Sequence, residues 1–349
     1  MTARQTVPFV LAALCAVAVA PAQEEYDMSP AKELARLKPL IGNWQGSGKM
    51  YEPGGQETPW TAKGTYRWTL NGHFVQEDFV IEMEGLPVPM VFRTYIGWDR
   101  EHGRYLAAMV SNEGVARLNE TQFLPDGTML TVQTHHQGGV PYNERARVKI
   151  DGDKMTMRID LLMAEGDSMK IIDCTMARGG GGFDGDWSTA PWMGAKPGAG
   201  MKGLARMAGT YATEGEMMMA PGMPSTGIHG TDSWQMVFGG TAMHGRTDGH
   251  ADGSSDAYES HALWGWDEHD QCMHAVFVDN MGQIGEMQCR WHDGKLISTM
   301  DGVQMGMPTT QRYVIYVDEN GHAKSCKGHS TFGDMDPFLS FKASYQKKK

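Results

Sequence analysis

The chain has 349 residues, of which 41% are hydrophobic, and a formal net charge of −11. This length corresponds to about two domains of ~100–200 residues each. The acidic balance argues against a nucleic-acid partner, because proteins that bind nucleic acids gather Lys and Arg to neutralise phosphates. The 44 glycines and the recurrent Asn-Gly, Asp-Gly and Gly-Gly pairs are typical of short antiparallel strands joined by tight turns.

The first 22 residues have the pattern of a secretory signal peptide. Arg4 provides the positive charge, and residues 7–20 form an apolar segment shorter than the ~20 residues that a membrane helix needs. Small residues at 20–22 then precede a cleavage point at Gln23. No later segment is long and apolar enough to span a bilayer. We therefore expect an exported protein, periplasmic or extracellular, that is soluble after cleavage.

Four cysteines remain after this cleavage, namely Cys174, Cys272, Cys289 and Cys326. An oxidising compartment permits disulfides between them. Cys272 and Cys289 flank a predicted turn near Asn280, so they are candidates for a bridge across a hairpin. A bridge and free buried thiols are both compatible with the sequence.

Residues 29–41 predict a short helix, with Pro30 at its first position and Leu34, Leu37 and Ile41 on one face. A glycine-rich strand follows at 42–48 and carries Trp44. From there to residue 178 the chain alternates short strands with turns such as Asn71-Gly72. About ten strands without an internal helix predict an up-and-down barrel over 29–178.

A stretch in this domain occurs a second time in the chain. Residues 97–99 and 265–267 both read Gly-Trp-Asp, followed by a polar turn and another strand-like run. Other matching positions, before and after this stretch, are separated by nearly the same number of residues as the two Gly-Trp-Asp stretches are. The sequence therefore predicts a tandem duplication, with a second barrel over 201–349 that also begins with a short helix or turn. We expect structural roles for Gly42, Trp98, Asp99, Arg178, Trp234, Trp266 and Asp267.

Residues 179–200 join the two copies and are rich in Gly and Pro, a composition that does not hold a core of its own. Trp187 and Trp192 are unusual in such a linker. We expect them to dock on one of the barrels.

Several motifs resemble the bacterial family called domain of unknown function 1579. They are the segments 40–48, 53–55, 64–68, 97–99 and the closing strand 169–178. The resemblance implies an all-β fold of two tandem lipocalin-like (calycin) antiparallel barrels, and it implies no established activity. Lipocalins place an Arg or Lys of the last strand over the Trp of the first. The resemblance thus implies a cation–π contact of Arg178 with Trp44, worth about 0.5–2 kcal/mol, whereas the second copy has Tyr211 and no evident cationic partner.

The first candidate site is a ligand cavity in the first barrel. Glu77 shares a predicted strand face with Val75 and Phe79, and a charged group on an apolar face must be paired, protonated or in contact with water. The residues predicted to line the cavity are Trp44, Trp68, Glu77, Arg93 and Tyr95. Such a cavity would take a small apolar or amphipathic ligand. Alternatively, the strand register is one residue out, and Glu77 and Arg93 face solvent.

Metal and haem sites are the other candidates. The Met-rich segment 216–223 has thioethers that suit Cu(I), and His and Asp are frequent at 244–256. However, methionine also fills apolar cores, and the spacing fits neither a calcium loop nor a zinc signature. Nitrobindins are barrels with a similar opening motif and a histidine haem ligand near the last strand, but 169–178 holds no histidine and His329 precedes the final strand of copy two. No cofactor or metal is therefore predicted.

The two copies differ most where residues 76–88 of the first, with Phe79 and Ile81, correspond to the polar, glycine-rich segment 244–256 of the second. We therefore expect unequal roles for the two barrels. No Gly-x-Ser-x-Gly motif is present. The sequence predicts an exported, non-enzymatic protein that binds a small ligand. The alternatives are a structural or interaction module with filled barrels and a haem- or metal-binding barrel.

Overall fold

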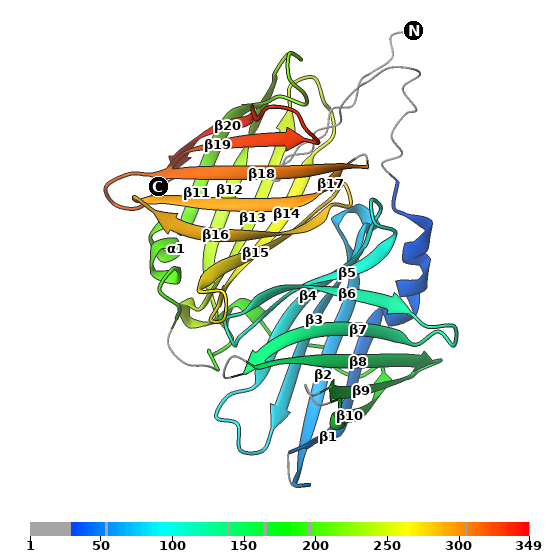
Figure 1. The fold of residues 1–349 in the computed structure, drawn as a ribbon. Helices are drawn as coiled ribbons and strands as arrows, with labels where there is room; N and C mark the ends of the chain where they lie inside the picture. Colours follow the sequence, from blue (N-terminus) through cyan, green and yellow to red (C-terminus); the bar gives the residue numbers. More distant parts are fainter. Residues whose placement is uncertain are drawn as a thin grey trace.

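The protein is seen here as a computed structural model that describes residues 29–52, 55–137, 140–162, 166–183, 185–193, 197–304 and 306–348. Two closed barrels of ten antiparallel strands each follow one another along the chain (Figure 1). The predicted signal segment, residues 1–22, lies outside the described residues. Among the described residues, no helix has the length and hydrophobicity of a membrane span.

The first barrel is a meander in which each strand pairs with the next. It closes where the first strand pairs with the tenth, with Trp44 opposite Arg178. Its strands are β1 (Gly42–Tyr51), β2 (Glu57–Thr69), β3 (Phe74–Met83), β4 (Met90–Asp99), β5 (Arg104–Ser111), β6 (Ala116–Phe123), β7 (Met129–Gln137), β8 (Val140–Asp151), β9 (Lys154–Leu162) and β10 (Ser168–Arg178).

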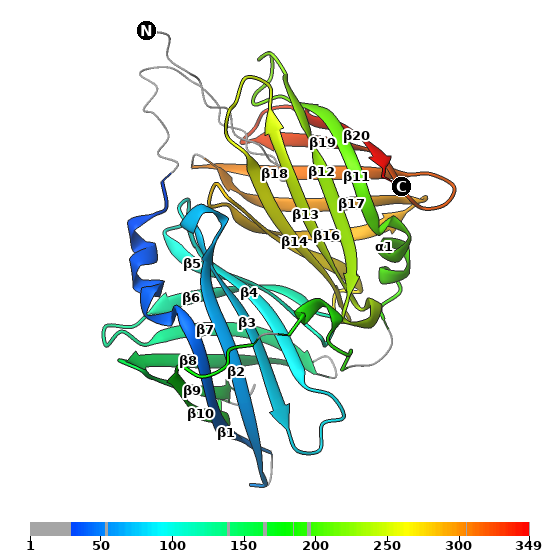
Figure 2. The ribbon, with the colours of Figure 1, turned by 180° about the vertical axis from the view of Figure 1, so that it is seen from behind.

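The second barrel repeats this topology and closes with Tyr211 opposite Lys347 (Figure 2). The predicted duplication is therefore matched by two copies of one architecture. Its strands are β11 (Gly209–Met217), β12 (Thr226–Val237), β13 (Ala242–Ala251), β14 (Tyr258–Asp267), β15 (Cys272–Asp279), β16 (Ile284–His292), β17 (Lys295–Gln304), β18 (Met307–Val317), β19 (Ala323–Phe332) and β20 (Phe338–Lys347).

A short helix precedes each barrel and covers the end where its first strand begins. In the first copy this is the 3₁₀ helix η1 (Lys32–Leu40), whose buried residues are Leu34, Leu37 and Leu40. Leu40 thus takes the place on the buried face that the sequence pattern assigned to Ile41, because a 3₁₀ helix has three residues per turn. In the second copy the α-helix α1 (Met201–Met207) buries its apolar residues in the same way.

A cation from the last strand lies over an aromatic ring of the first strand in both barrels. The guanidinium of Arg178 lies 4.3 Å from the Trp44 ring centroid, which is the contact that the sequence predicted. In the second barrel, Lys347 Nζ lies 5.9 Å from the Tyr211 ring and donates to the carbonyl of Ala208 at 3.0 Å. The second copy, in which no equivalent arginine was evident from the sequence, thus uses a lysine in this place.

The repeated Gly-Trp-Asp stretch forms a turn that is stabilised in the same way in both copies. The Asp99 carboxylate accepts the backbone N–H groups of residues 101 and 102, and Asp267 accepts those of residues 269 and 270. Trp98 packs edge-on against Tyr105 inside the first barrel, with ring centroids 4.7 Å apart. Trp266 packs against the core of the second barrel, to which the buried Trp234 belongs. This stretch therefore has a structural role.

The outer faces of the two barrels pack against each other through an apolar interface that includes the linker (Figure 2). Trp187, in the short 3₁₀ helix η3 (Trp187–Thr189), contacts both sides: its ring lies 4.2 Å from the Arg93 guanidinium and 5.4 Å from the ring of Phe238. The remaining 3₁₀ turns are η2 (Leu70–Gly72) and η4 (Phe238–Gly240), each between the second and third strands of its barrel. The linker tryptophan therefore docks on both barrels at once.

All four cysteines of the described chain are free and buried. Cys289 pairs with Met273, so Cys272 lies on the opposite face of the sheet from Cys289. A disulfide between these two cysteines would require their side chains to leave their faces of the sheet.

Candidate functional site

The interior of the first barrel is only partly filled by its own side chains. Residues that share the inward face with the buried Trp60 and Met155 remain half-buried on many strands. They are Met50, Met83, Met90, Phe92, Val148, Ile150, Met157 and Ile172. Because an apolar side chain that faces a packed core loses nearly all its solvent contact, this partial exposure indicates an open interior.

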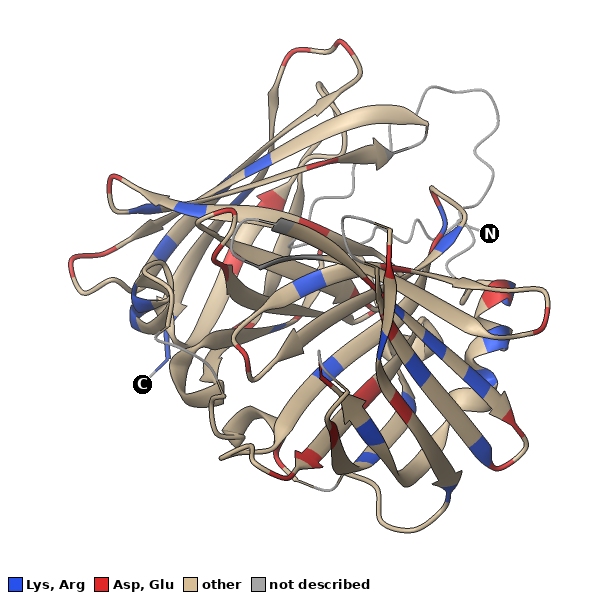
Figure 3. Ribbon diagram, turned by 60° about the horizontal axis from the view of Figure 1, so that its bottom comes forward, with Lys and Arg blue, Asp and Glu red and all other residues tan. Residues whose placement is uncertain are grey.

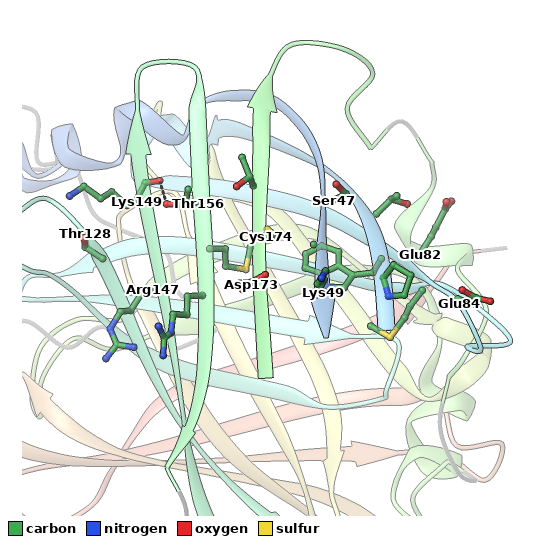
Figure 4. Close-up of a pocket in the computed structure, with 18 residues that line it drawn as sticks. Ser47, Lys49, Glu82, Glu84, Thr128, Arg147, Lys149, Thr156, Asp173 and Cys174 are labelled. Atoms are coloured by element: carbon green, nitrogen blue, oxygen red, sulfur yellow. Dashed lines mark hydrogen bonds between the residues drawn. The ribbon is translucent and has the colours of Figure 1, made fainter. Parts of the chain in front are cut away.

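A cavity of about 1140 Å³ runs along the wall of this barrel (Figure 4). Six neighbouring strands line it, in the order β3, β2, β1, β10, β9 and β8, together with Thr128. Trp60, Met83, Met157 and Cys174 provide inward apolar groups. This volume is at the upper end of ligand pockets, which span about 300–1,000 Å³.

Trp60 presents an unsatisfied hydrogen-bond donor at this cavity. Its side chain is only 3% exposed, and its indole Nε1 has no hydrogen-bond partner within the described part of the chain. Leaving a buried donor unpaired costs about 1–3 kcal/mol. A ligand with an acceptor atom would offset that cost. Nearby, burial raises the pKa of the Cys174 thiol to about 12, so this group is a neutral thiol at physiological pH.

Glu77 lies on the inward face with Val75 and Phe79 and is held by two hydroxyl groups. The Tyr66 hydroxyl donates a hydrogen bond to the Glu77 carboxylate, and Thr94 also donates to it. Burial raises the pKa of Glu77 despite these bonds, which favour the charged form. The carboxyl group is therefore a paired polar group within an otherwise apolar part of the wall.

The opposite wall, on β6, β7 and the first part of β8, carries polar side chains. Asn119 pairs with the inward Ala107, and Thr121 pairs with the inward Tyr105, so both point into the barrel. Thr121 also shares a 2.8 Å hydrogen bond with Thr131 of the next strand. The register continues this face to Arg117, Gln133, Tyr142 and Glu144. The interior is therefore apolar on one side and polar on the other.

Charged groups at the cavity margin carry both signs. Lys49, Arg147, Lys149 and Arg158 are lining residues, as are Glu82, Glu84 and Asp173. Many of them are neutralised locally: Arg147 and Arg158 both bind the buried Asp160, for example. Figure 3 accordingly shows Lys and Arg interspersed with Asp and Glu along the strands of this barrel. The margin does not favour ligands of one charge.

The structure brings only part of the predicted site together. Glu77 faces inward, as expected. Trp44 also faces inward but is fully buried beneath η1, where its indole donates to the carbonyl of Leu40 at 2.7 Å. Trp68 lies at the end of β2 and is 38% exposed. Trp44 and Trp68 are therefore at the covered end of the barrel, away from Trp60.

Arg93 and Tyr95 were assigned to the wrong face of β4. Both point out of the first barrel, where Arg93 Nε binds Asp78 Oδ1 at 2.6 Å and Tyr95 belongs to the interface cluster. Their alternation with Val91 was read correctly as one face, but that face is buried by the second barrel. When both faces of a strand are buried, the alternation of polar and apolar residues no longer distinguishes the inner face from the outer face.

The second barrel has a filled interior. Its core is continuous and contains mutually packed large side chains, listed here as Tyr211, Trp234, Trp264, Phe277, Tyr313, Phe341 and Tyr345. Asp232 is fully buried within it and accepts hydrogen bonds from Thr213 and Thr247. Burial raises the pKa of this carboxyl group. The two copies thus differ in whether they leave room inside.

The residues of the proposed copper and haem sites are dispersed. Met217 is buried in the core of the second barrel, and Met219 packs against that core, so part of the Met-rich run is core filler. His244 faces the interface, where its ring lies 5.4 Å from that of Trp187. His329 is exposed on β19. These residues do not converge on one centre.

Sequence reasoning missed two aromatic residues of the first barrel. Trp60 lines the cavity with an unpaired indole N–H, and the Tyr66 hydroxyl donates to Glu77. A signal was present, because Trp60, Ala62, Gly64 and Tyr66 alternate with polar residues along β2. Gly64 in this row makes room for Phe79, whose ring carbon would lie 2.5 Å from an added Cβ. The row therefore marks the inward face of β2.

The fold defines a tandem calycin-like protein with one open and one filled barrel. The chain belongs to the family described as "Protein of unknown function (DUF1579)", whose model matches residues 29–178 and 196–333. No curated protein sequence matches the chain.

Three solved structures are among those similar to it. Rv2717c from M. tuberculosis has 14% identity and a TM-score of 0.33, covering 44% of this chain and all of that protein. The S-type phycobiliprotein lyase CPES from Guillardia theta has 9% identity and a TM-score of 0.32, covering 46% of this chain and 99% of the lyase. A DUF3598 protein of unknown function from Nostoc punctiforme has 10% identity and a TM-score of 0.27, covering 91% of this chain and 100% of its own.

Proposed function

We propose that this protein is exported and that its first barrel binds a small amphipathic molecule, while the second barrel is a filled structural partner. The contrast between the two interiors carries the proposal. Inward apolar residues such as Met83 and Met157 stay half-buried and line a cavity of about 1140 Å³, whereas the equivalent space of the second barrel is occupied by aromatic side chains.

The walls of the first barrel indicate the chemistry of the ligand. An apolar body would cover the half-buried methionine and isoleucine side chains of β1, β9 and β10, and each Å² so buried contributes about 25 cal/mol. An acceptor atom would pair with Trp60 Nε1. Polar atoms would meet Asn119 and Thr121 on the other side. A lipid-like molecule with an ether, ester or hydroxyl group has this combination.

Export rests on residues 1–22, with Arg4 followed by the apolar segment 7–20. The test is to express the full chain in a Gram-negative host and to determine the N-terminus of the protein in the periplasmic fraction. A mature N-terminus at Gln23 supports export. Full-length protein that stays in the cytoplasm with Met1 intact contradicts it.

The binding proposal is tested first by native mass spectrometry of the purified protein. We expect a bound small molecule that is lost on denaturation. The protein is then stripped of this molecule and titrated with a fluorescent amphipathic probe, anilinonaphthalene sulfonate. The probe should bind with a stoichiometry of one and change the fluorescence of Trp60.

Two matched variants distinguish the cavity from the surface. Met157 faces inward and lines the cavity, whereas Val132 of β7 faces outward and is 38% exposed. Met157→Trp should fill the cavity and weaken probe binding at least tenfold, and Val132→Trp should leave it unchanged. Equal binding by both variants, or no saturable binding by the natural protein, contradicts the proposal.

A further inference from the structure

Three potential metal ligands lie together on the outer face of the second barrel. Asp270, Cys272 and His274 each offer one donor atom, and these atoms all lie within 4.8 Å of one another. Cys272 and His274 alternate at the start of β15, so the twofold period of a strand puts them on one face, and Asp270 lies in the turn just before the strand. This face is opposite to that of the core residue Met273.

The His274 ring is held in a fixed orientation by carboxylates at both nitrogens. Its Nδ1 lies 2.7 Å from Glu286 Oε1 on the neighbouring strand β16, and its Nε2 lies 3.0 Å from Asp270 Oδ2 (Figure 1 shows the two strands side by side). A carboxylate behind one ring nitrogen is the usual arrangement of a histidine that binds a metal through the other. Glu286 is therefore placed to orient His274 toward a shared site with Asp270.

The burial of Cys272 is a second, independent indication of a metal site. Its side chain is 1% exposed, and among the described residues its thiol forms no hydrogen bond that would explain its position beside an imidazole and a carboxylate. The Arg290 guanidinium donates to the carbonyl of Asp270 at 3.1 Å. Burial raises the pKa of the Cys272 thiol, and the charge of Arg290 opposes this only in part.

The first copy of the repeated turn has a possible metal ligand at only one of these three positions, His102 in place of Asp270, and it carries a cation in place of the cysteine. Cys272 corresponds to Arg104 and His274 corresponds to Leu106, counted from the shared Gly-Trp-Asp. Arg104 lies 3.4 Å from Asp99 and 2.9 Å from Glu120, so its guanidinium neutralises both carboxylates. In the second copy Asp267 takes the place of Asp99 and Gln288 takes that of Glu120, while the sulfur ligand Cys272 replaces the arginine and the nitrogen ligand His274 replaces Leu106.

We propose that Asp270, Cys272 and His274 bind a zinc ion, with a fourth position open to water and Glu286 as the outer partner of His274. One oxygen, one sulfur and one nitrogen ligand suit Zn²⁺, with bonds of about 2.0–2.3 Å. Neighbouring ligand atoms of a tetrahedral site are then less than about 4 Å apart, a separation that small side-chain rotations reach here. Binding releases the thiol proton of Cys272, and that of His274 when its ring is charged, to solvent.

The test uses the mature full-length protein, treated with a chelator and titrated with Co²⁺ as a spectroscopic substitute for zinc. We expect one equivalent to bind, with a thiolate-to-cobalt charge-transfer band and visible bands of tetrahedral cobalt, and Zn²⁺ should displace it. Cys272→Ala should abolish the charge-transfer band. His102→Ala, a change in the corresponding turn of the first copy, should retain both.

Glu286→Gln tests the outer partner, and it should weaken metal binding about 10–100-fold without removing the sulfur band. Thermal unfolding provides a second readout: Zn²⁺ should raise the Tm of the natural protein and of His102→Ala, but not that of Cys272→Ala or His274→Ala. Circular dichroism without metal establishes that each variant is folded. The inference is overturned if the natural protein binds no Co²⁺ with sulfur ligation, or if Cys272→Ala retains the band.

Discussion

Tyr95 of the first barrel stacks on His261 of the second, with ring centroids 5.4 Å apart and an interplanar angle of 19°. His261 in turn stacks on His244 at 5.2 Å, and His244 meets the linker ring of Trp187 edge-on. A continuous series of rings thus joins both barrels and the linker. The two domains are therefore expected to unfold as one unit.

Removing the Trp187 ring from the linker should allow the two barrels to unfold separately. Trp187 is 6% exposed and contacts both of them, so Trp187→Ala should cost about 3–5 kcal/mol. Calorimetry should then show two transitions in place of one. Trp68→Ala, at a ring that is 38% exposed, serves as the control and should keep a single transition. A single transition in both variants would contradict the coupling.

Acid should weaken this interface through His244. Burial, followed by the charges of His261, Arg93 and Arg246, lowers the pKa of His244 from 6.5 to about 3. Between these two pH values the unfolded chain binds a proton at His244 that the folded protein does not bind. The free energy of unfolding therefore falls as the pH drops from about 6.5 toward 3. The slope from this group is at most about 1.4 kcal/mol per pH unit.

The measurement is urea unfolding of the natural protein and of His244→Gln at several pH values between these limits. The variant should lose this part of the acid dependence. If both proteins show the same slope, His244 is not the group responsible.

Glu77 should make stability depend on pH in the opposite direction. Its folded-state pKa is raised above 4.5 by burial, so its stabilising contribution is complete below that value and is lost as the pH rises through the folded pKa. Relative to Glu77→Gln, the natural protein should become less stable as the pH rises above about 4.5. Tyr66→Phe removes a donor that favours the carboxylate, so it should enlarge this change. A pH-independent difference in the free energy of unfolding would contradict the assignment.

Gly265 allows the closest backbone approach between the barrels. An added Cβ would lie 2.3 Å from the backbone nitrogen of Ala116, and the next residue, Trp266, donates its N–H to the carbonyl of Gly114 at 2.9 Å. Gly265→Ala should therefore cost about 1–3 kcal/mol, since backbone must move. Gly302→Ala is the control: its nearest neighbour would be 3.7 Å away. Equal Tm values for the two variants would contradict this close packing.

Local patterns predicted the architecture because each strand and turn has its own signature. Tight-turn pairs, alternating residues and the repeated Gly-Trp-Asp stretch led to two barrels, and the resemblance led to the contact of Arg178 with Trp44. Lys347 was missed because it takes the role of Arg178 with a different residue type.

The site was predicted less well, because the interior of a barrel depends on long-range packing. Arg93 and Tyr95 lie on a strand that is buried on both faces, so alternation could not distinguish inside from outside. Whether a barrel is open depends on the summed volume of residues from ten strands. The Asp-x-Cys-x-His pattern at 270–274 does have the period of a strand face, but it matches none of the familiar zinc motifs.

The way each barrel closes sets an order of assembly during synthesis. The first barrel pairs β1 with β10, so it is complete once residue 178 has emerged. The second closes only when Lys347 reaches Tyr211, near the end of the chain. Until then, Val91, Tyr95 and Val110 have no second barrel to cover them. The first barrel therefore exposes an apolar surface until the second barrel has formed. During this time the chain is most prone to aggregation and most in need of chaperones.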